Sequence, residues 1–244
     1  SHSTVQGCVV HGMQGIGIRI NGGEHNTLRG NIAYHNDSGI YVGQGSTQNV
    51  VTENICAFGN QSSENADGIG SSDCAHNHYR CNVLYGNNDD GLDMWTSTGS
   101  VIEYNIATQN GDRKDGDGNG FKLGGHWKDD RPTSEVWTGG EHMVRHNLSF
   151  NNNSTGFTNN GSDGNTYEGN VAYGNANTSG YASVPHTDPA NGKPILADAQ
   201  EKFRELVEVR LLRLDQHPFP QEFEPVFELA GIERAGMSAA HTPD

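Results

Sequence analysis

Acidic residues and one lysine that could do chemistry are concentrated in three short, glycine-containing motifs. The motifs are NADGIG from Asn65, NNDDGLDMW from Asn87 and GNGFKLGG from Gly118. Carboxylates in this number suit calcium, because that ion accepts about six to eight oxygen atoms. An amine beside a bound cation can remove a proton that lies next to a carboxylate group. The side chains in question are Asp67, Asp89, Asp90, Asp93 and Lys122.

The stretch DGDGNGFKLGG, which contains Lys122, also fits the start of a helix–loop–helix calcium loop. Such a loop requires an acidic residue at its twelfth position, and counting from Asp115 that position holds His126. The flanking sequence predicts strands and loops rather than helices. We therefore place Lys122 on a strand and leave Asp117 as a minor ligand or a turn residue.

A recurring asparagine organises most of the chain, in segments such as GNIAYHN and CNVLYGN. An apolar residue follows each of these anchor asparagines, and a glycine–apolar pair such as Gly39-Ile40 comes further on, so each copy predicts short strands between turns. Successive anchors are 23, 28, 23, 42 and 23 residues apart, and Cys8 holds the same place one period earlier. The anchors are Asn31, Asn54, Asn82, Asn105, Asn147 and Asn170.

A unit of this length without a helical period cannot bury its apolar side chains alone, whereas stacked units can. We therefore predict an all-β fold, a parallel β-helix with about seven coils, one for each copy of the repeat. Equivalent residues of successive coils should lie about 4.8 Å apart, the spacing of paired strands. The turn asparagines should form ladders, because asparagine tolerates a left-handed backbone and its amide can bond from coil to coil.

The repeat also predicts how the chain divides. Residues 1–183 should form the parallel β-helix domain, and residues 184–244 a C-terminal extension. The extension contains ILADAQEKFRELVEVRLLRLD, whose apolar residues recur at helical spacing, so we expect a helix that caps the stack. Two longer copies carry insertions, and extra length in a solenoid enters loops on one face, often the binding face.

Stacking should bring the candidate site residues together. The position before the glycine–apolar pair holds Asp67, Asp90 and Asn119 on successive coils, and the position after it holds Asp93 and Lys122. Aspartates on two adjacent coils repel one another unless some are protonated or a cation lies among them. The alternative is a set of solvated turn aspartates, since NNDDG is a good turn sequence.

The formal net charge of -15 disfavours nucleic acid as a partner. No apolar run approaches the roughly 20 residues of a membrane span, so no membrane association is expected. A bound cation would nevertheless allow the chain to hold an acidic polysaccharide. Tryptophans could stack on sugar rings, and basic residues of the insertions could meet carboxylates. The candidate substrate-binding residues are Trp95, Arg113, Asn119, His126, Trp127 and Arg131.

The three motifs, in this order on successive coils, resemble polysaccharide lyase family 9. The type members of that family are pectate lyases with a right-handed parallel β-helix. The similarity covers roughly residues 31–175, with its core at residues 65–125. Family members are typically longer, with more coils ahead of the first calcium aspartate. The resemblance implies Lys122 as the Brønsted base and calcium ligands at Asp67, Asp89, Asp90 and Asp93.

The implied reaction is β-elimination in pectate (polygalacturonate) or another uronate polymer. Lys122 would remove the C5 proton while Ca²⁺ neutralises the uronate carboxylate, and an alkaline pH optimum is expected. Two alternatives stay open: a β-helix glycoside hydrolase that uses paired aspartates, and a non-catalytic, calcium-stabilised solenoid that binds polysaccharide. In each case we expect a secreted monomer, extracellular or periplasmic.

Overall fold

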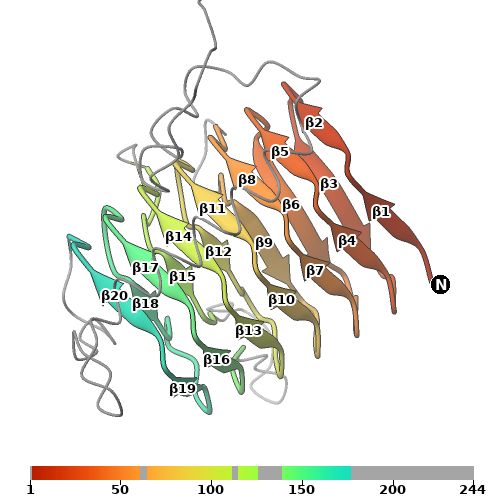
Figure 1. The fold of residues 1–244 in the computed structure, drawn as a ribbon. Helices are drawn as coiled ribbons and strands as arrows, with labels where there is room; N and C mark the ends of the chain where they lie inside the picture. Colours follow the sequence, from red (N-terminus) through yellow and green to blue (C-terminus); the bar gives the residue numbers. More distant parts are fainter. Residues whose placement is uncertain (1, 61–64, 112–114, 126–138, 177–244) are drawn as a thin grey trace, which may run out of the picture. The chain divides into compact units, whose positions relative to one another are not determined.

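The computed structural model describes residues 2–60, 65–111, 115–125 and 139–176, which form strands, turns and loops without helices. Within this part of the chain no helix is long and apolar enough to span a membrane. The strands build three parallel sheets in which each strand pairs with its counterpart one coil away (Figure 1). The fold is therefore a right-handed parallel β-helix with seven coils, as the repeat predicts.

Each coil contributes one strand to each of the three sheets. Among the described residues only the last coil has no strand in the third sheet. Sheet A contains β1 (Thr4–Gln6), β4 (Thr27–Arg29), β7 (Val50–Thr52), β10 (His78–Arg80), β13 (Val101–Glu103), β16 (Met143–Arg145) and β19 (Thr166–Glu168). Sheet B contains β2 (Val9–His11), β5 (Ile32–Tyr34), β8 (Ile55–Ala57), β11 (Val83–Tyr85), β14 (Ile106–Thr108), β17 (Leu148–Phe150) and β20 (Val171–Tyr173). Sheet C contains β3 (Ile16–Asn21), β6 (Ser38–Gly43), β9 (Ile69–Ser72), β12 (Leu92–Asp93), β15 (Phe121–Lys122) and β18 (Phe157–Thr158).

The core consists of columns of apolar side chains, because register repeats from coil to coil. In sheet A the middle residue of each three-residue strand points inward. Val51, Tyr79 and Ile102 hold this middle position on three successive coils, pair in register, and are fully buried. In sheet C the rings of Phe121 and Phe157 stack with their centroids 4.8 Å apart. A coil that has few apolar residues can thus bury nearly all of them, which explains the low hydrophobic content of 32%.

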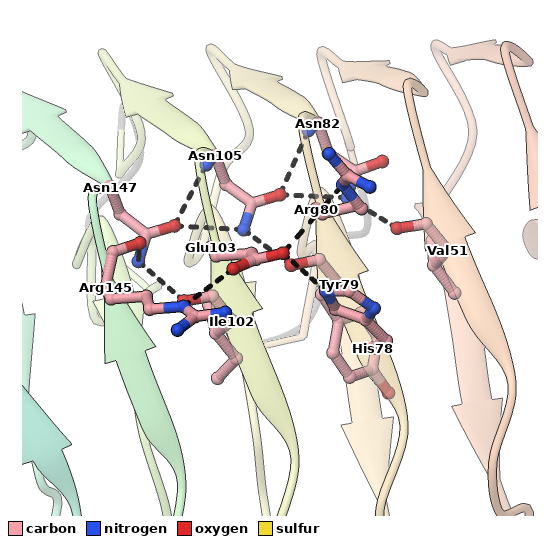
Figure 2. Close-up of polar contacts among 10 residues, drawn as sticks. All are labelled: Val51, His78, Tyr79, Arg80, Asn82, Ile102, Glu103, Asn105, Arg145 and Asn147. Carbon is pink, nitrogen blue, oxygen red and sulfur yellow. Dashed lines mark hydrogen bonds and ion pairs between the residues drawn. The ribbon is translucent and has the colours of Figure 1, made fainter.

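The anchor asparagines form a continuous ladder at the corner between sheets A and B (Figure 2). Asn82 donates to Asn105 Oδ1 from its backbone N–H at 3.0 Å and from Nδ2 at 2.9 Å. Asn105 in turn donates from both groups to Asn147 Oδ1, and its Nδ2 also donates to the carbonyl of Tyr79. The predicted ladder is confirmed, and its buried amides are fully hydrogen-bonded.

The backbone conformation at this corner differs from the prediction. The anchors do not adopt positive φ; the residue before each anchor does, with φ of 61° at Glu53, 54° at Cys81 and 55° at Tyr104. The anchor must direct its amide along the stack beside the backbone of the next coil, so the chain reverses one residue earlier. The expectation that asparagine itself would take the left-handed conformation was therefore wrong.

Two further ladders, which the repeat did not predict, occupy the other ends of the strands in sheets A and B. One joins Asn87, Asn110, Asn152 and Asn175 after sheet B. The other ladder precedes sheet A and is not made of asparagine throughout. Its members after Asn77 are Ser100 and His142, which accept from the N–H of the preceding member. The predicted extension, residues 184–244, and its capping helix lie outside the described residues, and so does the last glycine–apolar pair, Gly180-Tyr181.

Candidate active site

Sheet C places the predicted site residues in two adjacent columns. Strand pairing aligns Gly70 with Asp93, Asp93 with Lys122 and Lys122 with Thr158. In the neighbouring column the N–H of Asp90 donates to Asp67 Oδ1 at 3.2 Å, and the N–H of Asn119 donates to Asp90 Oδ1 at 2.7 Å. The columns predicted from the glycine–apolar frame are therefore confirmed.

The carboxylates of these columns form two overlapping clusters. Oxygen atoms of Asp67, Asp90 and Asp93 lie within 4.8 Å of one another, and so do those of Asp89, Asp90 and Asp117. Asp90 belongs to both clusters and is fully buried. Asp89 thus groups with Asp90 and Asp117 rather than with the other two predicted ligands.

Burial and mutual repulsion disfavour the ionised forms of these acids. Burial, followed by the charges of Asp93, Asp90 and Asp89, raises the pKa of Asp67 well above its usual range. Burial also raises the pKa of Asp93 to about 6, although the Lys122 ammonium opposes that rise. Such a cluster gains stability from added positive charge.

Among the described residues, Lys122 is the nearest positive charge to the clusters. Its Nζ lies 2.8 Å from Asp117 Oδ2, 3.1 Å from Asp93 Oδ2 and 3.4 Å from Asp90 Oδ2. Burial alone would lower the pKa of Lys122, but the charges of Asp93 and Asp90 and the contact with Asp117 together raise it well above its usual range. Without a metal ion this side chain is therefore a protonated counter-ion.

Asp117 has a larger part in this site than the sequence indicated. Its carboxylate makes the shortest contact with Lys122, and its N–H donates to Asp89 Oδ1 at 2.6 Å. It lies in the longest insertion, outside the repeat frame, so stacking could not place it. The sequence feature that indicated a role for Asp117 is the pattern DGDGNG, which fits the start of a calcium loop.

The donor set fits a calcium ion. Every candidate ligand atom of the two clusters is a carboxylate oxygen, without nitrogen or sulfur donors. Asp90 Oδ2 and Asp93 Oδ1 are buried and have no hydrogen-bond partner, and Asp90 Oδ2 has an ion-pair contact with Lys122 Nζ at 3.4 Å. Buried carboxylate oxygens are seldom left in this state, and a cation would satisfy them.

The predicted substrate-binding residues have different settings. Asn119 is buried, donates from Nδ2 to Asp90 Oδ1 at 3.0 Å, and accepts from the N–H of Thr155, so it positions Asp90. The ring of Trp95 is half-buried with Lys122 Nζ 5.5 Å from its centroid. A Cβ at Gly125 would lie 2.3 Å from that ring, so only glycine allows it to lie there. The other candidates lie outside the described residues: Arg113, His126, Trp127 and Arg131.

An open groove of about 1050 Å³ runs over the outer face of sheet C and ends at the carboxylates. Its lining begins at Arg19 on β3, passes Tyr41 on β6 and reaches Trp95 and Lys122. The groove crosses successive coils along the stack, so an elongated ligand fits it better than a compact one.

Comparison with known proteins agrees with this architecture. A protein-family model, described as the Pel9A-like right-handed β-helix region, matches residues 1–191 of the chain. The chain belongs to the Pel9A-like β-helix family. Pectate lyase L of Thermoclostridium stercorarium is 31% identical over an alignment 179 residues long, which covers 64% of this chain and 14% of that protein. Pectate lyase L of Dickeya chrysanthemi is 31% identical over an alignment 176 residues long, which covers 66% of this chain and 39% of that protein.

Solved structures share the fold of this family member. The crystal structure of pectate lyase Pel9A matches with a TM-score of 0.56 and 26% identity over 68% of this chain and 43% of that one. The A-module of the Azotobacter vinelandii mannuronan C-5 epimerase AlgE4 matches with a TM-score of 0.54 at 17% identity, over 74% of this chain and 57% of that module. The chain therefore spans less than half the length of these pectate lyases.

Proposed function

We propose that this chain carries the active site of a calcium-dependent polysaccharide lyase. Its substrate would be a uronate-containing polymer, with pectate favoured, and the reaction a β-elimination. The observation that carries the proposal is the position of Lys122 Nζ, 3.1 Å from Asp93 and 3.4 Å from Asp90, beside the buried Asp93 Oδ1, which has no hydrogen-bond partner. The pectate lyases among the relatives support it.

Calcium would be held by Asp67, Asp90 and Asp93, with Asp89 offering a further oxygen through the second cluster. When bound, the ion would supply positive charge that neutralises the uronate carboxylate and makes both the C5 proton and the Lys122 ammonium more acidic. The chain's own contribution is to hold these ligands in register on β12 and on the turns that precede β9 and β12.

Lys122 is the residue we assign to the proton transfer. Its neutral amine takes the C5 proton of the uronate, the released electron pair forms the C4=C5 double bond, and the C4–O bond breaks with its electrons on the leaving oxygen. The amine lies at the floor of the groove with 9% of its side chain exposed, and the Trp95 ring covers one side of it. Both features limit access of bulk water to the base.

The hydrolase alternative fits the geometry less well. Glycoside hydrolases separate their two carboxyl groups by about 5–5.5 Å or about 6.5–9.5 Å. Here the oxygens of Asp67, Asp90 and Asp93 lie within 4.8 Å of one another, closer than either spacing. A hydrolytic mechanism would also leave Lys122 without a chemical role.

The test is to incubate the purified protein with polygalacturonate, with calcium and with a chelator. We expect ultraviolet absorbance from the C4=C5 bond of the product to grow in calcium and to stop when the chelator is added. New reducing ends without this absorbance would support the hydrolase. Polymer binding without either product would support the non-catalytic solenoid. For access to such a polymer we propose that the protein is secreted and acts as a monomer.

A further inference from the structure

A second charged feature lies at the opposite end of the groove. Strand pairing aligns Arg19 with Tyr41 and Tyr41 with Gly70, and Gly70 in turn aligns with Asp93 and Asp93 with Lys122. Arg19 therefore occupies the same column as the candidate base, four coils before it. At about 4.8 Å for each coil the two residues are separated by roughly 19 Å along the groove.

Arg19 differs from every other basic residue in the described part of the chain. Arg29 pairs with Glu53 on sheet A, and Glu103 accepts from Arg145 and lies 3.9 Å from Arg80 (Figure 2). Lys122 pairs with aspartates. Among the described arginines and lysines only Arg19 has no carboxylate partner, although the chain carries a formal net charge of -15.

The Tyr41 ring supports the guanidinium of Arg19. The Cζ atom lies 5.0 Å from the centroid of the Tyr41 ring, which supports the cationic group from one side. The ring itself packs against the neighbouring coil, because a Cβ on Gly70 would lie 3.2 Å from Tyr41 Cδ2. The side chain of Arg19 is exposed and lines the groove. Its N–H groups are therefore available to a ligand in the groove.

We infer that Arg19, held on Tyr41, forms a second subsite that binds the carboxylate of another uronate unit of the same polymer. A guanidinium offers two parallel N–H groups to a carboxylate, and a bidentate contact of this kind is specific for planar anions. The distance from Lys122 exceeds one sugar ring, so the subsite recognises a unit remote from the cleaved bond. The inference rests on the proposed function for the class of ligand.

The experiment compares polygalacturonate binding by the full chain and by Arg19→Gln, in calcium and at fixed salt, with Arg29→Gln as the matched control. We expect Arg19→Gln to weaken binding by about three- to tenfold, the range of an exposed charge-assisted contact. Arg29→Gln removes the same charge from sheet A and should leave binding unchanged. Binding to polygalacturonate whose carboxylates are methyl-esterified should not respond to Arg19→Gln.

The length of the uronate oligomer distinguishes binding at this subsite from binding at the Lys122 site. Short uronate oligomers that cannot span the groove should bind equally to wild type and Arg19→Gln, whereas long ones should not. Equal binding of the long polymer by both proteins would overturn the inference and leave the proposed function standing. Weaker binding by Arg19→Gln in a protein that forms no ultraviolet-absorbing product would overturn the proposed function and retain the subsite.

Discussion

Asp93 and Lys122 are register partners on adjacent strands, and their side chains meet at 3.1 Å. The same Asp93 carboxylate has a buried oxygen without a partner, and it belongs to the cluster proposed to hold calcium. In the proposed site one carboxylate would thus face two cations, the lysine ammonium and a calcium ion. Lysine and calcium would then compete for negative charge, and calcium titration would measure this competition separately from the proposed elimination.

We predict that Lys122→Met abolishes elimination and increases calcium affinity. Loss of the base should reduce the rate by about 10²- to 10⁴-fold. Removal of the ammonium from between three carboxylates should tighten calcium binding by at least about tenfold. Product absorbance and calorimetric calcium titration measure the two effects. Lys122→Arg is the matched control, because it keeps the positive charge and should lose activity without this gain in affinity.

Asp90→Asn should remove calcium binding more completely than Asp117→Asn does. Asp90 is buried and belongs to both carboxylate clusters, whereas the Asp117 side chain is 61% exposed at the rim of one. Calcium should raise the melting temperature of the wild type and of Asp117→Asn, and should have little effect on Asp90→Asn. A calcium-induced shift of wild-type size in Asp90→Asn would show that the ion binds elsewhere.

His142→Asn should flatten the dependence of stability on pH. His142 is fully buried in the ladder before sheet A, where its Nδ1 accepts from the N–H of Ser100 and its Nε2 has no partner. Burial lowers the pKa of His142 to about 4 from 6.5. The folded state therefore binds fewer protons than the unfolded state in this interval, so the contribution is complete above pH 6.5 and is lost as pH falls towards 4.

The size of this effect follows from the pKa difference. At 1.36 kcal/mol per pKa unit, the stability of the wild type relative to His142→Asn should fall by about 3 kcal/mol between the two pKa values. Asparagine occupies the equivalent ladder position on other coils, at Asn49 and Asn77, so the variant should fold. Urea denaturation at several pH values measures the difference. Parallel pH profiles for the two proteins would contradict the prediction.

Asn105→Ala should destabilise the solenoid by about 3 kcal/mol or more. The substitution leaves the buried carbonyl of Tyr79 and the buried N–H and amide of Asn82 without their partner, and each orphaned group costs about 1–3 kcal/mol. Asn21→Ala, at an exposed strand end, should change stability by less than about 0.5 kcal/mol. Chemical denaturation of both variants in calcium gives the comparison. Similar values for the two would show that the ladder contributes little.

The sequence was sufficient to predict the stack and the register of its third sheet. Because equivalent residues recur at a nearly constant interval, the frame alone placed Asp93 beside Lys122 and Asp90 beside Asn119. The same frame, extended one coil earlier, aligns Arg19 with Tyr41. Arg19 was not singled out from the sequence, although the Gly17-Ile18 pair that precedes it follows the same glycine–apolar pattern.

Other features could not be predicted because they depend on geometry that the repeat does not encode. Asp117 reaches Lys122 from an inserted segment, whose path no periodicity determines. The raised pKa of Lys122 depends on how many carboxylates converge on it, and three do rather than the single neighbour that the frame suggested. The reversal before each anchor asparagine likewise depends on where its amide must point.

The hydrogen-bond geometry of the asparagine ladder does not depend on the number of residues between successive members. The Nδ2-to-Oδ1 distance is 3.0 Å between Asn31 and Asn54, which are 23 residues apart, and also between Asn105 and Asn147, which are 42 apart. Loops can therefore be lengthened or exchanged between two coils while the floor of the groove keeps its dimensions. Variation in ligand preference among proteins of this architecture can thus arise by replacing whole loops, with the residues on the strands left unchanged.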